Sequence, residues 1–371
     1  MKQGRTLEQL GIELERQRNA RKDFLADTRN LFFKTEGKWS RLAVMTEKGG
    51  YEFGVTDLAH QQIATRLGIP YRYYQKMQQE APALLAENIN TWFRDTPERR
   101  MVRVLDGNVR AFLSDRYRRL DNLELCAAVL PVIRDMKGAS IESCEVTDRH
   151  LYLKVINKRL KAEVAVGDVV QAGFVISNSE VGLGSLKVEP LVFRLVCKNG
   201  LICKDYAQKK YHVGRQAEGN MEETYEIFSD ETLKQDDKAF FMKVQDTVRC
   251  AVDESKFLLT VDKMREAKDI PMGHDPVKEV ELLADKFLLT QNERGDVLRQ
   301  LFMSGDSSRY GLVNAVTAAS KIATDYERAT ELERIGGEIL SLPVPKKLLT
   351  EIVTPSKEIR NITPSRQMIT A

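Results

Sequence analysis

Eight arginines lie within 26 residues of this sequence and form its strongest candidate for chemistry. They are Arg94, Arg99, Arg100, Arg103, Arg110, Arg116, Arg118 and Arg119. A guanidinium group is a planar fork of donors that fits a phosphate. Arg103 and Arg110 lie on opposite sides of a predicted turn, where like charges normally cost stability unless an anion lies between them. The block therefore predicts contact with a polyanion.

Two aromatic residues, Phe112 and Tyr117, lie among these arginines. Cations for the phosphate backbone and rings for base stacking are together typical of single-strand binding. The nucleic-acid-binding candidates in this block are Arg103, Arg110, Phe112, Arg116, Tyr117, Arg118 and Arg119. The alternative is a solvated face whose arginines pair locally with Asp106 and Asp115.

A second basic group follows near residue 200 and again mixes cations with rings. Its candidates are Lys198, Lys204, Lys209, Lys210 and Arg215. An exposed connector of the same composition is the alternative interpretation.

The loop GFVISNSEVGLGS, residues 173–185, combines hydroxyl groups, an amide and three glycines. Its backbone amides could bind phosphate, but it lacks the G-x-x-x-x-G-K-[ST] pattern of a P-loop. No neighbouring base would activate Ser179, and Glu180 is an isolated acid without the second carboxylate that a two-metal site needs. We therefore predict no catalytic residues, no metal and no cofactor, and we do not expect an enzyme.

Cysteine and histidine usage indicates a reducing compartment without a structural zinc. The five cysteines form no C-x-x-C pair, and the four histidines are far apart in the sequence, whereas zinc ligands are closely spaced. No apolar run approaches the length of a membrane span, and the first residues do not read as a secretory signal. These features predict a cytoplasmic protein with reduced thiols and no membrane partner.

The small net charge of +3 hides an uneven distribution. Residues 1–220 hold 36 Lys and Arg against 27 Asp and Glu, whereas residues 221–300 hold 12 against 19. A basic part before an acidic part indicates a polyanion-binding face and a separate element that does not touch the polyanion. Charge pairing between domains is the alternative.

The residue patterns predict an α+β protein, with an antiparallel sheet packed on helices and a helical C-terminal region. Four regions are expected: 1–100 with a helical hairpin, a basic α+β core at 101–215, acidic helices at 222–340 and an irregular tail at 341–371. The apolar content of 42% suffices for a sizeable core.

Local signals place the elements within these regions. Hairpins are expected at residues 38–53, around a Gly-Gly pair, and at 101–114, around Asp106-Gly107. Residues 1–36 read as a helix and connector, and 141–157 and 169–177 as strands. The remaining expected elements are helices at 81–97 and 121–136, a strand ending before Pro190, a helix ending at Asn199-Gly200, and one long helix at 309–340.

Residues 56–77 have the outline of a helix-turn-helix, with Thr56 at the first helix start and Gly68 at the turn. A tight helical hairpin without DNA contacts gives the same pattern. A sequence-specific duplex-binding regulator that uses this hairpin is therefore the alternative function.

Three blocks of sequence resemble a family of uncharacterised phage- and plasmid-borne domains that includes prophage proteins of unknown function. They are RAFLSDRYRRLDNLEL at 110–125, GFVISNSEVGLGS at 173–185 and FRLVCKNGLI at 193–202. The resemblance covers roughly residues 40–215 and continues weakly into RYGLVNAVTAA at 309–319. It implies a role in mobile DNA.

The order of helix, strands, G-x-x-x-S-x-[SG]-E loop and helix is also similar, more distantly, to the core of single-strand annealing recombinases. That likeness implies head-to-tail homo-oligomers, as rings or filaments, with single-stranded DNA in a basic groove. Arg110, Arg116, Arg118 and Arg119 would contact the DNA backbone. The loop residues Ser177, Asn178, Ser179 and Glu180 would lie near the groove or the protomer interface.

Annealing requires no covalent chemistry, only extended backbone binding that leaves bases free to pair. We therefore expect a non-catalytic single-stranded DNA-binding and annealing protein of phage or plasmid recombination. Besides the duplex regulator, a protein-interaction factor of a mobile element is a further alternative.

Overall fold

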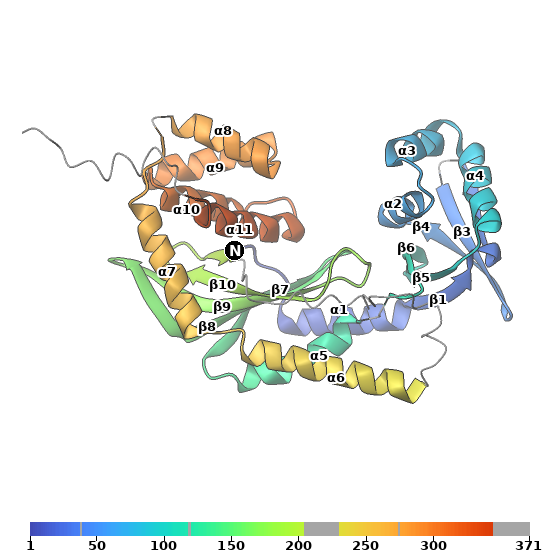
Figure 1. Ribbon diagram of the computed structural model, residues 1–371, viewed down its shortest axis with the longest axis horizontal. Coiled ribbons are helices and arrows are strands. Elements are labelled where there is room, and N and C mark those ends of the chain that lie inside the picture. The colour runs from blue at the N-terminus through green and yellow to red at the C-terminus, as the bar shows by residue number, and fades with distance from the viewer. Residues whose placement is uncertain (38, 118–119, 204–229, 274, 344–371) are drawn as a thin grey trace, which may run out of the picture. The chain divides into compact units, whose positions relative to one another are not determined.

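The structure is a computed structural model that describes residues 1–37, 39–117, 120–203, 230–273 and 275–343, with only the backbone at 230–237. Residues 1–340 form one compact unit, and residues 341–371 are assigned to a second. The predicted α+β class is confirmed by two sheets with packed helices and a helical C-terminal region. Figure 1 shows these elements.

The first sheet has six strands in the order β1-β5-β6-β4-β3-β2. Its strands are β1 (Lys22–Asp27), β2 (Leu31–Glu36), β3 (Trp39–Thr46), β4 (Gly49–Val55), β5 (Arg99–Leu105) and β6 (Asn108–Ser114). All neighbours are antiparallel except β4 and β6. Both predicted hairpins are therefore confirmed, whereas β1 and β2 lie where the sequence predicted only a helix and connector.

Three helices pack on this sheet: α2 (Asp57–Arg66), α3 (Tyr71–Glu80) and α4 (Pro82–Asp95). Thr56 caps α2 by accepting a hydrogen bond from the backbone of Ala59. Gly68, which has a φ of +66°, closes the turn before α3. The predicted helical hairpin is confirmed, and its inner face joins the core with the buried Ile63 and Tyr74.

The second sheet is a five-stranded antiparallel meander. Its strands are β7 (Ala139–Val146), β8 (Leu151–Ala165), β9 (Asp168–Asn178), β10 (Lys187–Arg194) and β11 (Asn199–Ile202). The predicted strand at 141–157 is thus a hairpin of β7 and β8, because the chain reverses at residues 147–150.

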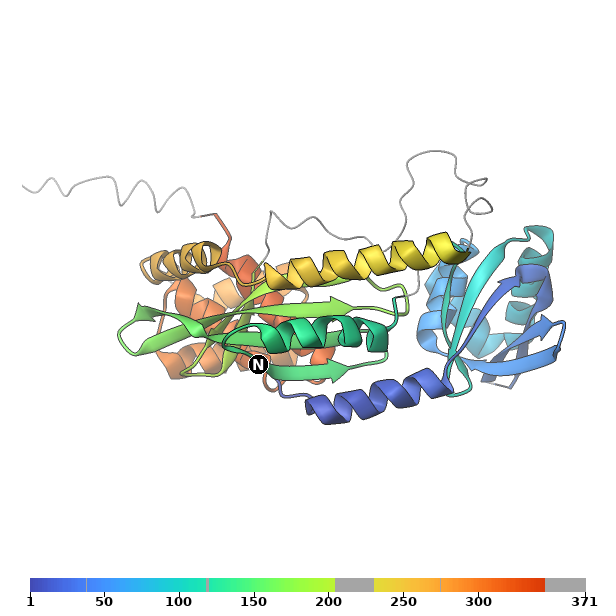
Figure 2. The same ribbon diagram turned by 90° about the horizontal axis from the view of Figure 1, so that it is seen from below.

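Helices cover both faces of this meander. One face carries α1 (Leu7–Ala20), α5 (Asn122–Asp135) and α6 (Asp230–Arg249), and Figure 2 shows α5 and α6 side by side across it. Their apolar side chains share a core with β7 to β10. The other face is covered by α10 (Arg309–Ala319) and α11 (Tyr326–Leu340). The remaining helices are α7 (Glu254–Lys268), α8 (Pro276–Phe287) and α9 (Gln291–Ser304).

Three expectations for the later elements are wrong. β10 continues through Pro190 into a turn and β11, so no helix ends at Asn199-Gly200. Pro190 lies opposite Cys203, just beyond the end of β11, and its carbonyl accepts a hydrogen bond from the backbone of Cys203. The N–H that proline lacks would point to the same side, where β11 has already ended. Proline is therefore tolerated at this position. The predicted long helix at 309–340 is two helices, α10 and α11, broken at residues 320–325.

The six-stranded sheet crosses the boundary that was expected between residues 100 and 101, since β5 and β6 pair with β1 and β4. The expected tail lies outside the described residues except for 341–343. Among the described helices, none has the length and apolar character that crossing a bilayer requires.

Candidate functional site

Arg103 on β5 is fully buried, with 0% exposure, and is held by acidic residues rather than by an external anion. Its guanidinium donates to Asp23 at 3.1 Å, to Asp121 at 2.8 Å and to the carbonyl of Glu180 at 2.8 Å. The prediction that Arg103 contacts nucleic acid is therefore corrected, because in this structure the side chain has no accessible surface.

Arg110 is paired internally as well. A bulge in the β5–β6 ladder at Arg103 and Val104 leaves Arg110 without a cross-strand partner, and its guanidinium pairs with the buried Glu180. Asp121 precedes α5 but accepts no capping hydrogen bond from it, since it pairs with Arg103 and Arg21. Burial opposes ionisation of Asp121, but the charges of Arg103 and Arg21 outweigh it and lower the pKa of Asp121.

The aromatic candidates are also used within the fold. Phe112 is buried and stacks on Phe93 with ring centroids 5.7 Å apart, so its predicted role in base stacking is corrected. Tyr117 is partly buried and donates to the carbonyl of Ser179 at 2.7 Å. Arg116 is exposed, as the prediction requires. Arg118 and Arg119 lie outside the described residues.

The end of β9 and the first residues of the loop after it, residues 178–181, are buried and bonded to neighbouring segments. Asn178 donates to Asn122 Oδ1 and the Leu120 carbonyl, and Ser179 donates to the carbonyl of Arg149. Glu180 accepts from the backbone of Asn122 at 2.6 Å and from Arg110. Ser177, in contrast, lines a cavity together with the loop residues 183–185. This segment therefore contacts the predicted arginine block through Ser179 and Glu180 and also lines a cavity that the sequence did not predict.

Lys198 is exposed in the turn before β11, at a φ of +51°. The other members of the second basic group, Lys204, Lys209, Lys210 and Arg215, lie outside the described residues.

The cavity beside Ser177, which we call the α11 groove, has a volume of about 560 Å³. It lies between α11, the end of α8, the β7–β8 turn and the loop before β10. Its lining includes Arg149, His150, Tyr152, Leu183, Gly184, Ser185, Lys187, Lys286, Phe287, Leu288, Glu327, Glu331, Arg334, Ile335 and Glu338. A cavity of this size accommodates a group as large as a nucleotide.

Three cations line the α11 groove without an acidic partner, and the Nζ of one of them, Lys286, lies 5.2 Å from the centroid of the Phe287 ring. Arg149, Lys187 and Lys286 are exposed, and none of them forms an ion pair with a residue that the structure describes. Arg334, by comparison, is paired with Glu189 at 2.6 Å. Phe287, which is partly exposed, adds an aromatic ring to the same wall as Lys286. Unpaired cations beside a ring are suited to a phosphate with an attached base.

A histidine and a carboxylate form the polar floor of the groove. His150 Nδ1 lies 2.9 Å from Glu327 Oε2, Tyr152 donates to the same oxygen at 2.8 Å, and Thr147 donates to the other oxygen. Burial raises the pKa of Glu327, but these hydrogen bonds outweigh it and hold that pKa at about 2. Glu327 is therefore a carboxylate at neutral pH.

Sequence reasoning missed this set because its members come from four separate segments. Arg149 and His150 precede β8, Lys187 begins β10, Lys286 lies in the last turn of α8 and Glu327 lies on α11. No short motif joins them. Of the loop 173–185, which the sequence singled out, Ser177 and residues 183–185 line the groove, whereas Asn178, Ser179 and Glu180 do not.

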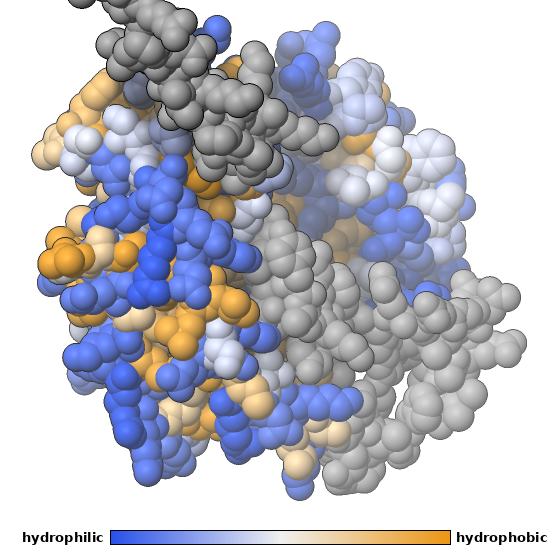
Figure 3. Space-filling view, turned by 60° about the vertical axis from the view of Figure 1, so that its left-hand side comes forward, coloured by the Kyte–Doolittle hydropathy of each residue, from blue (hydrophilic) through white to orange (hydrophobic). Residues whose placement is uncertain are grey.

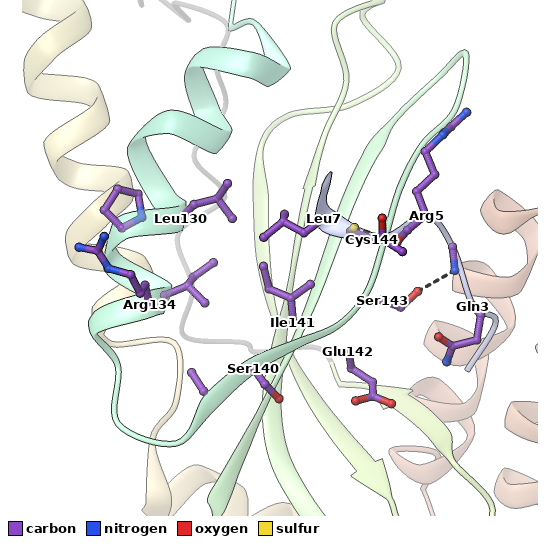
Figure 4. Close-up of a pocket in the computed structure, with 15 residues that line it drawn as sticks. Gln3, Arg5, Leu7, Leu130, Arg134, Ser140, Ile141, Glu142, Ser143 and Cys144 are labelled. Carbon is purple, nitrogen blue, oxygen red and sulfur yellow. Dashed lines mark hydrogen bonds between the residues drawn. The ribbon is translucent and has the colours of Figure 1, made fainter. Parts of the chain in front are cut away.

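A larger groove, of about 760 Å³, lies between α5, β7 and residues 3–7. Figure 4 shows Leu7, Leu130 and Ile141 directed into it. The adjoining edge of β7 is bulged between Ile141 and Ser143 and is bridged at Cys144 by Arg5. Bulges and covering segments prevent an edge strand from accepting another strand.

The helices α7 to α9 expose apolar side chains among hydrophilic ones, and Figure 3 shows such apolar areas on that side of the molecule. The exposed residues there include Leu258, Leu259, Leu282, Phe302 and Met303. The cations that line the β7 groove, Arg5 and Arg134, are paired with Glu145 and Asp135, so of these two cavities the α11 groove is the better candidate for an anionic ligand.

A family model described as a domain of unknown function, DUF932, matches residues 111–337, which is more than half of the chain. The protein therefore belongs to the DUF932 family, and the prediction of an uncharacterised domain family is confirmed. No curated protein and no solved structure matches the chain. The matched segment contains the second sheet, α5 to α10 and every groove residue from Arg149 to Ile335.

Proposed function

We propose that this DUF932 protein binds single-stranded DNA without covalent catalysis and promotes the annealing of complementary strands. The observation that carries the proposal is the set of three exposed cations, Arg149, Lys187 and Lys286, around one nucleotide-sized groove. Phosphates supply most of the affinity in such complexes, and lysine and arginine neutralise them.

The concave shape of the site favours a single strand. A base can enter a cavity only when it is unstacked, whereas duplex readout places a helix or ribbon of the protein into the groove of the DNA. The ring of Phe287 offers a surface for such a base. The distant resemblance to annealing recombinases adds the expectation of a homo-oligomer, as a ring or filament, and of a role in phage or plasmid recombination.

The test measures binding of a labelled oligo(dT) strand by fluorescence anisotropy across a salt series, with the matched duplex as competitor. The groove variant carries Arg149→Ala, Lys187→Ala and Lys286→Ala. We expect it to lose roughly tenfold or more in affinity, because three charge-assisted contacts disappear. Annealing of two complementary labelled strands should slow in parallel.

The control variant carries Arg72→Ala, Lys76→Ala and Arg94→Ala, which removes the same charge from exposed positions on α3 and α4. It should bind the strand as the unmodified protein does. Equal loss in the two variants would indicate a general charge effect, and unchanged binding by the groove variant would refute the site.

One observation favours a second candidate, a duplex-binding regulator. The outer face of α3 exposes Arg72, Gln75, Lys76 and Gln79, which are residue types that read base edges in a major groove. In that case the control variant, and not the groove variant, should lose binding, and the loss should concern a particular duplex sequence.

A further inference from the structure

His150 presents a hydrogen-bond acceptor to the α11 groove. Glu327 is a carboxylate and can only accept, so in the tautomer that this contact favours the proton resides on Nδ1, and Nε2 keeps a free lone pair. No residue within the described ranges donates a hydrogen bond to Nε2. A Cβ on Gly184 would lie 3.7 Å from Nε2, so glycine leaves the space before the ring open.

α11 adds a second acceptor to the same groove. Glu327 and Glu331 are four residues apart and therefore share one face of the helix. Glu331 lines the groove, and its carboxylate accepts one hydrogen bond from Arg328 at 2.8 Å, which leaves further lone pairs available. The floor and the α11 wall thus offer acceptors, whereas Arg149, Lys187 and Lys286 offer positive charge.

From this arrangement we infer that the groove is a base pocket that holds one unstacked base of the bound strand. The acceptors of the protein recognise hydrogen-bond donors on that base, and guanine is preferred. The inference rests on the proposed function and specifies the ligand. Guanine carries two adjacent donors on its Watson–Crick edge, N1–H and the N2 amino group. Both match acceptors such as His150 Nε2 and Glu331.

The other bases match this floor less well. Thymine has one donor between two carbonyl oxygens, which the Glu331 carboxylate repels. Adenine and cytosine each have one amino group beside a ring nitrogen that is itself an acceptor. A base that leaves a polar group of the pocket unpaired should bind less tightly than guanine, because an unpaired buried polar group costs free energy.

The experiment compares labelled oligo(dT) strands that differ only at one central position, which is dT, dG, dA, dC or deoxyinosine. Deoxyinosine keeps N1–H but lacks the N2 amino group, so it isolates one donor. We expect the dG strand to bind about fivefold tighter than the dT strand, which corresponds to about one net hydrogen bond, with deoxyinosine between them.

Two variants test the assignment without touching the cations. His150→Ala removes the acceptor, and Gly184→Val fills the space in front of Nε2, at a position whose φ does not require glycine. Each should make the dG and dT strands bind equally, because the acceptor that distinguishes the two bases is removed or covered. Circular dichroism and thermal unfolding verify that both variants fold.

The outcomes separate this inference from the proposed function. Absence of binding to any strand, or binding that ignores the loss of the three cations, refutes the proposed function. Cation-dependent binding that is equal for all five strands, or a dG preference that persists in both His150→Ala and Gly184→Val, overturns the base pocket alone.

Discussion

Arg103 is a fully buried cation whose charge is balanced by Asp23 and Asp121. Replacing Arg103 with Met should destabilise the protein by about 3 kcal/mol, because two buried carboxylates lose one of their partners and keep only the more distant or shared cation Arg21. Arg116→Met is the matched control: Arg116 is exposed, and its loss should change the free energy of unfolding by less than about 0.5 kcal/mol. Urea denaturation followed by tryptophan fluorescence measures both. Equal stability of the two variants would contradict the buried network.

His60 is a second residue whose environment sets its behaviour. It is buried in the first sheet's core, lies 2.7 Å from the Tyr74 hydroxyl, and burial lowers its pKa from 6.5 to about 4. The folded state thus favours the neutral ring. The resulting contribution to stability is complete above pH 6.5 and is lost as the pH falls from 6.5 towards 4.

The expected loss is roughly 3 kcal/mol for the unmodified protein over that range. His60→Gln, which does not titrate, should show a shallower decline in urea midpoints measured at the same pH values. A parallel decline in both proteins would exclude His60 as the titrating group.

α11 approaches β11 so closely at Gly337 that the position should not tolerate a larger residue. A Cβ at Gly337 would lie 2.0 Å from the carbonyl oxygen of Ile202, so Gly337→Ala must displace the helix from the sheet. We expect a loss of about 2 kcal/mol or more in the free energy of unfolding. Gly11→Ala in α1 is the control, since no atom lies within 4 Å of its Cβ position; it should stabilise by about 0.5–1 kcal/mol. Thermal unfolding of both variants decides, and a tolerated Gly337→Ala would contradict the packing.

Local signals were sufficient for some elements and not for others. Gly-Gly and Asp-Gly turns predicted both hairpins, and Thr56 with Gly68 predicted the bounds of α2, because each signal acts on its own neighbours. Pro190 misled because its effect depends on where β11 ends, which is a tertiary property. The break between α10 and α11 was missed because the apolar pattern continues through residues 320–325.

At the scale of the molecule, the sequence predicted the α+β class, the antiparallel sheet on helices and the helical C-terminal region. The role of the arginine block could not be predicted in the same way. The number of arginines in a short stretch does not reveal distant partners such as Asp23, which is 80 residues from Arg103. For the same reason the α11 groove could not be predicted: Arg149, Lys187 and Lys286 are brought together only by the folded chain.

The central claim is that these three cations contact the phosphates of a single strand, and the salt dependence of binding tests it most directly. For single strands, the slope of log affinity against log salt is about −0.7 per phosphate contact. Arg149→Ala, Lys187→Ala and Lys286→Ala together should therefore make the slope less negative by about 2, while the α3–α4 control variant keeps the original slope. An unchanged slope in the groove variant would show that the strand does not lie in the α11 groove.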